Sequence, residues 1–171
     1  RLVHPFILRR LKTDKDIIDD LPDKVEQKVY CNLTQEQASL YQAVVDDVQQ
    51  QIEETEGIQR KGLILATLMK LKQICNHPAQ FLQDGSEFDE SRSHKLSRIS
   101  EMVAEALQDN DSLLIFTQFT DIGTQLETLF RETHACPVYY LHGGTSRKHR
   151  EQMIENFQSL DTPAGVFILS L

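Results

Sequence analysis

Three short runs of consecutive apolar residues occur in the second half of the chain, and they limit its possible folds more than any other feature. The runs are 113–116, 138–141 and 166–169. Before and between them, apolar residues recur at the three- and four-residue spacing of amphipathic helices. Strands that are apolar throughout and alternate with helices are typical of a parallel sheet covered on both faces. Residues 94–171 are therefore predicted to form a doubly wound α/β lobe.

The first half of the chain has a helical pattern instead. Thr34 and Gln37 have the spacing of a capping box, and helical periodicity follows until Gly57 interrupts it. A second apolar helix, with a stripe wide enough to be buried on more than one side, then runs to Pro78, which stops it. Residues 34–78 are therefore predicted to be a helical hairpin.

Two segments without strong periodicity flank this hairpin. Residues 1–33 are expected to be an extended lead-in, with a turn at Leu21-Pro22-Asp23 and a strand over 25–33. Residues 79–93 contain Gly85 and several acids, and they are expected to be a solvated acidic loop that separates the hairpin from the lobe.

Composition excludes several classes of protein. Of 171 residues, 40% are hydrophobic and 26% are charged, which is typical of a globular chain rather than a disordered one. No apolar run is long enough to cross a membrane, and the first residues do not form a signal peptide. Cys31, Cys75 and Cys136 are widely separated, which argues against a disulfide framework and favours a reducing compartment. The chain starts without methionine and ends in an apolar run, so we expect it to be a piece of a longer protein.

Charge alone gives an ambiguous indication about a polyanionic partner. The net charge of -8 disfavours nucleic acid, but acids and bases are segregated along the chain. Residues 34–57 contain acids and no base, whereas residues 58–78 contain Arg60, Lys61, Lys70 and Lys72 and no acid. A basic face on an acidic body is therefore possible, although charge runs are more often simply solvated surfaces.

The loops that follow the predicted strands are the candidate site, because ligands bind beyond the carboxyl ends of parallel strands. Thr117 and Gln118 follow the first strand, and Gly143 and Gly144 follow the second. In the second loop, Thr145 or Ser146 could cap the next helix, and Arg147, Lys148 and Arg150 add positive charge, which suits a phosphate. A plain turn with solvated bases explains the glycines equally well. Thr117 and Gln118 suit either hydrogen bonding to a ligand backbone or an ordinary helix start.

Other combinations of reactive side chains are weaker candidates. Cys75 and His77 have no second ligand pair at metal-binding spacing, so a packed thiol and a histidine at a turn are favoured. His142 and His149 are separated by a loop, so a shared metal is not expected. A catalytic cysteine and histidine pair stays open, but no strained nucleophile turn supports it. No loop ends in Gly-Lys-Ser/Thr, so the chain alone is not expected to bind ATP tightly.

Five segments carry a resemblance to a known family. They are Pro5-Phe6-Ile7-Leu8-Arg9-Arg10, Asp20-Leu21-Pro22-Asp23-Lys24, Leu71-Lys72-Gln73-Ile74-Cys75-Asn76-His77-Pro78, Ile115-Phe116-Thr117-Gln118-Phe119 and His142-Gly143-Gly144-Thr145. In this order they resemble the Swi/Snf family of helicase superfamily two, and Cys-Asn-His-Pro is specific for it. The resemblance implies the RecA-like, P-loop-NTPase-like second lobe of a DNA-dependent ATPase that translocates on duplex DNA and remodels or displaces bound proteins. The hairpin resembles the helical insertion of that family.

The resemblance also implies roles for individual residues. Thr117 and Gln118 match one DNA-facing motif of the lobe. Gly143, Gly144 and Thr145, with Arg150 behind them, match the next one, and the expected role of both motifs is to hold backbone phosphates without reading sequence. Ser93-His94-Lys95-Leu96 resembles a Ser-Gly-Lys-Leu element in which His94 takes the place of glycine, and Lys95 is carried over as a DNA-binding candidate.

By the same resemblance, the ATP and Mg²⁺ sites belong to the parent protein. The nucleotide-binding lysine and the magnesium motif lie in the missing first RecA-like lobe, and the arginine that reaches the transferred phosphate lies beyond Leu171. This fragment is therefore expected to contain no catalytic residue, bind no cofactor or metal alone, and hydrolyse no ATP. The expected partners are double-stranded DNA, the first lobe and DNA-bound proteins, with no membrane.

Two other interpretations stay open. The lobe could belong to an RNA or DNA helicase of superfamily two, although Cys-Asn-His-Pro and the hairpin argue against this. Alternatively, residues 34–78 could dock a partner helix, as a non-enzymatic interaction module with the lobe as scaffold. The parent protein is expected in the prokaryotic cytoplasm, associated with the nucleoid, or in the nucleus if it is eukaryotic.

Overall fold

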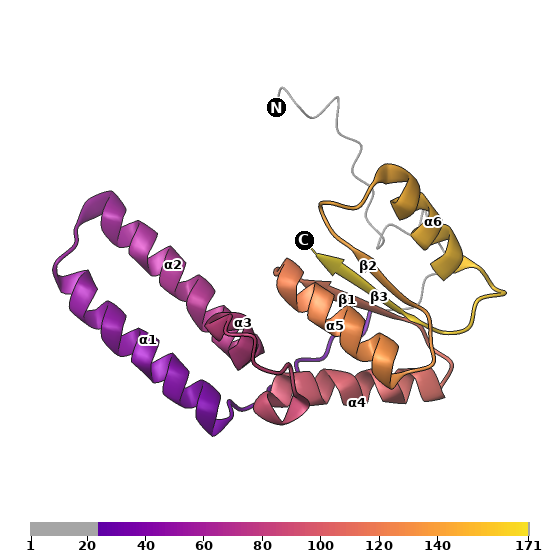
Figure 1. Ribbon diagram of the computed structural model, residues 1–171, viewed down its shortest axis with the longest axis horizontal. Coiled ribbons are helices and arrows are strands. Elements are labelled where there is room, and N and C mark those ends of the chain that lie inside the picture. Colours follow the sequence, from indigo (N-terminus) through magenta and orange to yellow (C-terminus); the bar gives the residue numbers. More distant parts are fainter. Residues whose placement is uncertain (1–23, 171) are drawn as a thin grey trace. The chain divides into compact units, whose positions relative to one another are not determined.

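A computed structural model describes residues 24–170 (Figure 1). The chain divides into two compact units, Arg1–Tyr30 and Cys31–Leu171. The predicted strand over 25–33 is wrong, because residues 24–33 contain neither helix nor strand. Val25 and Tyr30 are exposed, and a strand is stable only when its backbone groups pair with a neighbouring strand. The predicted turn at Leu21-Pro22-Asp23 lies outside the described residues.

The helical hairpin consists of α1 (Gln35–Glu53) and α2 (Gly57–Asn76), which lie side by side (Figure 1). The predicted capping box at the start of α1 is confirmed, with Thr34 accepting from the Gln37 amide and Gln37 accepting from the Thr34 amide. The chain reverses at Gly57, whose φ of 60° suits a residue without a Cβ atom. Val44 and Val48 of α1 are buried in the hairpin.

The outer face of α2 is more exposed than its sequence suggested. Leu65, Leu68 and Met69 are 65%, 50% and 46% exposed, and Ile58 is exposed as well. The prediction that α2 is buried on more than one side is therefore wrong for the described residues. Among the described elements, α1 and the next two α-helices of the chain contact this helix, and the wall of the apolar stripe that carries Leu65 faces solvent.

The segment after the hairpin is more ordered than the loop expected over 79–93. It contains α3 (Pro78–Leu82) and a short 3₁₀ helix, η2 (Glu90–Arg92). The His77 side chain caps α3, and Pro78 occupies the first helical position, where no backbone donor is needed. The Asp89 side chain caps η2 by accepting from the Ser91 amide. Side-chain caps therefore organise a segment that has no apolar periodicity.

The second half of the chain forms the predicted parallel α/β lobe, which is confirmed. Its elements are α4 (His94–Gln108), β1 (Leu113–Thr117), α5 (Thr120–Thr133), β2 (Val138–Leu141), α6 (Arg147–Gln158) and β3 (Val166–Ser170). The strand order is β1-β3-β2, and both pairings are parallel. Leu113 and Val138 both pair with Val166, so the three strands begin at the same level.

The two faces of the sheet are covered unequally. On one face, Ile115, Ile168 and Tyr140 pack with Val103 of α4 and Phe130 of α5 in the main core. On the other, Phe167 packs edge-to-face against Phe157 of α6, with ring centroids 5.2 Å apart. Leu114 and Phe116 of β1 lie on this second face and remain 57% and 58% exposed. Among the described residues, the expected cover on both faces is therefore present over the first three residues of β3 but not over β1.

Candidate nucleic-acid interface

The carboxyl ends of the strands bring the two predicted DNA-facing loops to one edge of the sheet. Thr117 at the end of β1 pairs with Ser170, and Leu141 at the end of β2 pairs with Leu169. Since β3 lies between the other two strands, the loops after β1 and β2 are separated by about 10 Å, two strand spacings. A continuous strand of nucleic acid could contact both loops.

The loop after β1 is held by contacts within itself and to α2. The Thr117 hydroxyl accepts a hydrogen bond from the Phe119 amide at 3.1 Å, so it forms a local turn before α5. Gln118 is exposed, and its Oε1 atom accepts a hydrogen bond from Lys72 Nζ at 2.9 Å. Of the two roles that the sequence left open, Thr117 makes the local turn, while Gln118 faces the hairpin.

Lys95 lies beside this loop and completes one group of candidates. Its Nζ atom donates a hydrogen bond to Asn76 Oδ1 at 3.1 Å. Lys95, Thr117 and Gln118 line a hollow of about 540 Å³ between α2 and the end of β1, together with Lys72 and Asn76. The structure thus brings together three of the predicted residues. It adds Lys72 and Asn76 from the hairpin. The basic composition of residues 58–78 could have indicated Lys72, and the Cys-Asn-His-Pro element could have indicated Asn76.

The glycine loop after β2 is largely closed on itself. The Gly144 amide donates to His142 Nδ1 at 3.2 Å, and the Thr145 amide donates to the His142 carbonyl at 3.0 Å. The Thr145 hydroxyl accepts from the His142 amide at 3.1 Å, so Thr145 is not the cap of α6. That cap is Ser146, which accepts from the His149 amide. These contacts favour a plain turn for Gly144 and Thr145.

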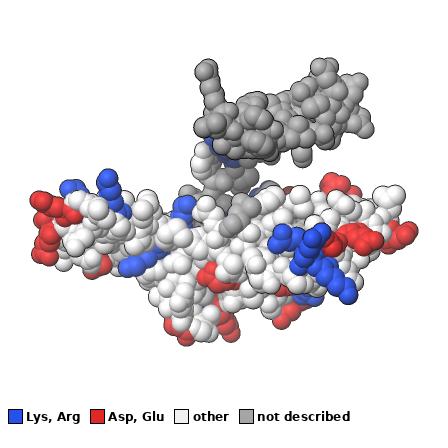
Figure 2. All heavy atoms as spheres, turned by 90° about the horizontal axis from the view of Figure 1, so that it is seen from above, with Lys and Arg blue, Asp and Glu red and all other residues white. Residues whose placement is uncertain are grey.

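Arg150 belongs to this second group, at the start of α6. It is exposed, as is the neighbouring Arg147, which forms an ion pair with Glu151 at 2.9 Å. Neither Gly143 nor Arg150 lines the hollow beside β1, so the candidates form two groups rather than one site. Figure 2 shows one cluster of Lys and Arg side chains over the half of the molecule that carries the sheet, with acidic side chains beside it, and further Lys and Arg side chains on the hairpin, whose far end is acidic.

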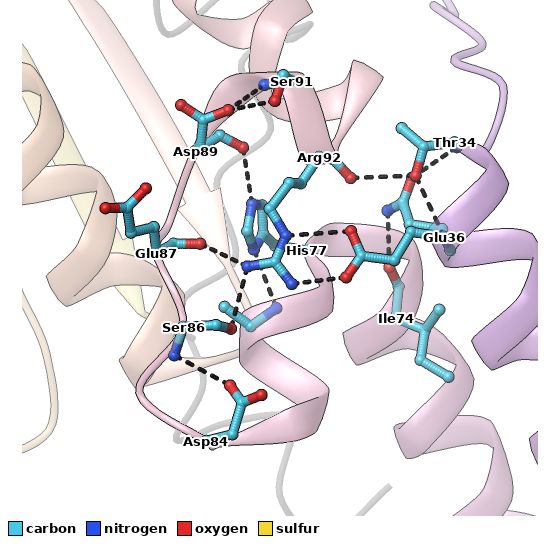
Figure 3. Close-up of polar contacts among 12 residues, drawn as sticks. Thr34, Glu36, Ile74, His77, Asp84, Ser86, Glu87, Asp89, Ser91 and Arg92 are labelled. Carbon is cyan, nitrogen blue, oxygen red and sulfur yellow. Dashed lines mark hydrogen bonds and ion pairs between the residues drawn. The ribbon is translucent and has the colours of Figure 1, made fainter.

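A polar joint centred on His77 connects the hairpin to the segment over 79–93 that precedes the lobe (Figure 3). The His77 ring is fully buried; its Nδ1 atom accepts from the Ala79 amide at 3.1 Å, and its Nε2 atom donates to the Asp89 carbonyl at 2.9 Å. Burial lowers the pKa of His77, which keeps the ring neutral. Because both ring nitrogens are engaged, His77 does not fit the role of a metal ligand with Cys75.

Arg92 is the second centre of this joint. It donates two hydrogen bonds to the Glu36 carboxylate, at 2.6 and 3.1 Å, and one to the Glu87 carbonyl at 2.7 Å. Its hydrogen bonds to Glu36 raise the pKa of Arg92 and lower the pKa of Glu36. The Arg92 carbonyl also accepts from the Thr34 hydroxyl at 3.2 Å, which ties the start of α1 to the same point (Figure 3).

The remaining candidates for cofactor and nucleophile chemistry do not fit the described residues. Among residues 24–170, no group of three or more His, Cys, Asp or Glu side chains could hold a metal ion. Burial raises the pKa of the Cys136 thiol, which opposes formation of a thiolate nucleophile. The sequence also contains no Gly-Lys-Ser/Thr loop of the kind that cradles a nucleotide triphosphate. No helix in this part of the chain is long and apolar enough to cross a bilayer.

Known proteins similar to this chain share both its sequence and its fold. Residues 1–80 match the SNF2-related domain, and residues 94–170 match the helicase conserved C-terminal domain. A relative from Bacillus subtilis (strain 168), YwqA, provisionally named an ATP-dependent helicase/translocase, is 40% identical over 172 residues. The alignment covers all of this chain but 18% of YwqA, so the chain spans less than a fifth of that relative.

Two solved structures from Sulfolobus solfataricus are also similar. The SWI2/SNF2 ATPase C-terminal domain is 42% identical with a TM-score of 0.81, and the alignment covers 87% of this chain and 64% of that one. The SWI2/SNF2 ATPase core in complex with dsDNA is 46% identical with a TM-score of 0.81, over 99% of this chain and 36% of that one. The predicted RecA-like fold is therefore confirmed. The chain belongs to the SNF2 family of helicase superfamily two, of which it forms a C-terminal lobe.

Proposed function

We propose that this chain is part of a DNA-dependent ATPase that translocates on duplex DNA and remodels or displaces the proteins bound there. The observation that carries the proposal is the convergence of Lys95, Thr117 and Gln118 around one hollow at the carboxyl edge of β1. Gly143 and Arg150 follow β2 at the same edge of the sheet and would form a second set of contacts to the DNA backbone, with Gly144 and Thr145 shaping the turn between them. The similar Sulfolobus core is a complex with dsDNA, which supports duplex DNA as the ligand.

The chemistry of these residues suits a motor that must bind any sequence. Lysine, arginine, amide and hydroxyl groups bind phosphate oxygens, which are the same at every base pair. ATP hydrolysis would then take place where this lobe meets a first RecA-like lobe, which would hold ATP and Mg²⁺, and opening and closing of that interface would drive each step along DNA. We place the parent protein in the prokaryotic cytoplasm, on the nucleoid, or in the nucleus if it is eukaryotic.

The test is ATP hydrolysis by the full-length parent protein, measured without nucleic acid, with duplex DNA and with single-stranded RNA. We expect strong stimulation by duplex DNA and a loss of that stimulation in Gln118→Ala and Arg150→Ala. The matched control is Arg98→Ala, because Arg98 pairs with Glu101 and Glu105 on the exposed side of α4, away from the hollow. Stimulation by RNA alone would contradict the proposal and favour an RNA helicase.

The exposed apolar face of α2 favours a second candidate function. Leu65, Leu68 and Met69 could dock a partner helix, with the α/β lobe as scaffold. This interaction module predicts no ATP hydrolysis with any nucleic acid and no effect of Gln118→Ala on nucleic-acid binding. The same assay therefore separates the two functions.

A further inference from the structure

Two lysines from different parts of the chain line the hollow beside β1. Lys72 belongs to the last turns of α2, and Lys95 belongs to the first turn of α4. Both are exposed, and both contribute to the lining of the same space of about 540 Å³. Lys72 is absent from the residues that the sequence motifs nominate for DNA binding, so its place here needs an explanation.

Each ammonium group is held by a neutral amide. Lys72 Nζ donates to Gln118 Oε1 at 2.9 Å, and Lys95 Nζ donates to Asn76 Oδ1 at 3.1 Å. No carboxylate of the described residues lies within 4 Å of either nitrogen, whereas Arg92, Arg131 and Arg147 each have a carboxylate partner. An amide oxygen fixes the position of an ammonium group without cancelling its charge, so both charges stay available to an anion.

The amide that holds Lys95 is itself held in one orientation. Asn76 Nδ2 donates to Gln80 Oε1 at 3.1 Å, and Gln80, which is buried, donates in turn to Asp121 Oδ1 at 3.2 Å. The backbone carbonyl of Asn76 accepts a hydrogen bond from the Ser93 hydroxyl at 2.7 Å, which fixes the backbone at this residue. Because the Asn76 NH₂ group is engaged with Gln80, its Oδ1 atom must face Lys95. The Cys-Asn-His-Pro element, which the sequence motifs mark but leave without a role, thus holds a lysine.

We propose that Lys72 and Lys95 form a paired phosphate site, with Gln118 and Asn76 as positioning residues, and that it takes phosphodiesters of the DNA backbone. The assignment to DNA rests on the proposed function, because the hollow opens beside the predicted DNA-facing loop at Thr117. The site makes the hairpin part of the DNA-binding surface. It also connects DNA binding to the polar joint at His77, because His77 follows Asn76 directly in the chain.

The test is the salt dependence of duplex binding by the full-length protein, measured by fluorescence anisotropy without nucleotide. Each phosphate contact that is lost should lower the slope of log affinity against log salt by about 0.9. Lys72→Gln and Lys95→Gln should each have this effect, and the double variant should lose about twice as much. The matched control is Lys61→Gln, which removes the same charge from α2 outside the hollow and should leave the slope unchanged. An equal loss with Lys61→Gln would show a diffuse basic helix and overturn the proposal.

Two substitutions of Asn76 test the positioning role. Asn76→Asp keeps an oxygen beside Lys95 but cancels its charge, so the slope should fall as it does in Lys95→Gln, with no further fall when both changes are combined. Asn76→Leu should weaken binding at every salt concentration without cancelling a charge, so the slope should change much less. If Asn76→Asp and Asn76→Leu change the slope equally, the role of Asn76 is structural and the positioning claim is wrong.

Two further outcomes separate this site from the proposed function. If the wild-type protein binds duplex DNA but the two lysine variants keep the full slope, the paired site is wrong and the proposed function stands. If the wild-type protein does not bind duplex DNA at all, the proposed function fails. Titration calorimetry with inorganic phosphate tests whether the hollow binds free phosphate instead of the phosphodiesters of DNA. Binding that is lost in the double lysine variant, with the DNA slope unchanged, would assign the hollow to a free phosphate and overturn the assignment to DNA.

Discussion

At the scale of single residues, His77 shows how burial selects one chemical form. The centroids of the His77 and Phe88 rings lie 4.4 Å apart, and His77 has no exposed surface. The Ala79 amide needs an acceptor at Nδ1, and the Asp89 carbonyl needs a donor at Nε2. Only the neutral ring protonated at Nε2 satisfies both, because a charged ring has no acceptor.

The stability of the chain should therefore fall in mild acid. Burial holds the pKa of His77 below its ordinary value of 6.5, so the unfolded chain binds a proton before the folded chain does. The contribution of neutral His77 to the free energy of unfolding is therefore fully present above pH 6.5, and it is lost as the pH falls from that value towards the folded-state pKa. Urea unfolding at about pH 7.5 and about pH 5.5 should show a lower free energy of unfolding at the lower pH. In His77→Gln this difference should shrink; an unchanged difference would assign the pH dependence to other groups.

The Arg92 guanidinium should stabilise the chain through its geometry as well as its charge. Arg92→Lys keeps the charge but loses the paired hydrogen bonds to Glu36 and the bond to the Glu87 carbonyl. We expect a loss of about 1–3 kcal/mol in the free energy of unfolding, measured with urea. Arg98→Lys is the control, because its ion pairs lie along the exposed side of one helix, where solvent screens them, and the loss should be smaller than in Arg92→Lys. Equal losses in the two variants would refute the claim.

At the scale of elements, α5 lies close to the sheet because it carries a glycine where the two meet. A Cβ atom at Gly123 would overlap the Tyr140 ring of β2. The Tyr140 hydroxyl donates to the Thr120 carbonyl at 2.8 Å, so the ring bridges the strand and the first turn of α5. The glycine sets the distance between helix and strand, and the loop at Gln118 lies just before this helix.

Two glycine substitutions in helices should therefore have opposite effects. Gly123→Ala should destabilise the lobe by about 1–3 kcal/mol, because the Tyr140 ring must move. Gly62→Ala in α2 should stabilise the chain by up to about 1 kcal/mol, because nothing lies within 4 Å of the added methyl group and alanine favours helix. Thermal unfolding followed by circular dichroism measures both. A stabilising Gly123→Ala would mean that the helix is not held by this contact.

At the scale of the whole molecule, the hairpin and the lobe belong to one compact unit, Cys31–Leu171. Hydrogen bonds from side chains to backbone atoms hold this unit together. The Ser93 hydroxyl at the start of α4 donates to the Asn76 backbone carbonyl at 2.7 Å. The Thr34 hydroxyl donates to the Arg92 carbonyl of the segment between hairpin and lobe, and Gln37 Nε2 donates to the Ile74 carbonyl, which holds the two helices of the hairpin together. We therefore expect the hairpin to follow the lobe in any movement that the parent protein makes.

This unit alone should not hydrolyse ATP. Its sequence contains no Gly-Lys-Ser/Thr loop, and phosphoryl transfer in the proposed parent needs a second lobe. Phosphate release by the purified chain should stay at background with and without duplex DNA, while the full-length protein should show DNA-stimulated turnover. Turnover that a single substitution within this chain abolishes would contradict the prediction.

The sequence by itself determined the hairpin and the elements of the parallel lobe, but not α3 and η2, which side-chain caps organise without apolar periodicity. The apolar runs of β1, β2 and β3 and the capping box at Thr34 predicted the parallel lobe and the start of α1, because local periodicity and local hydrogen bonds decide such features. Only the tertiary structure decided which elements and side chains are neighbours. The order β1-β3-β2, the burial of His77 and the exposure of one side of α2 depend on contacts between residues far apart in the chain. The same holds for Lys72 and Gln118, since a single sequence carries no signal for a hydrogen bond between residues 46 positions apart.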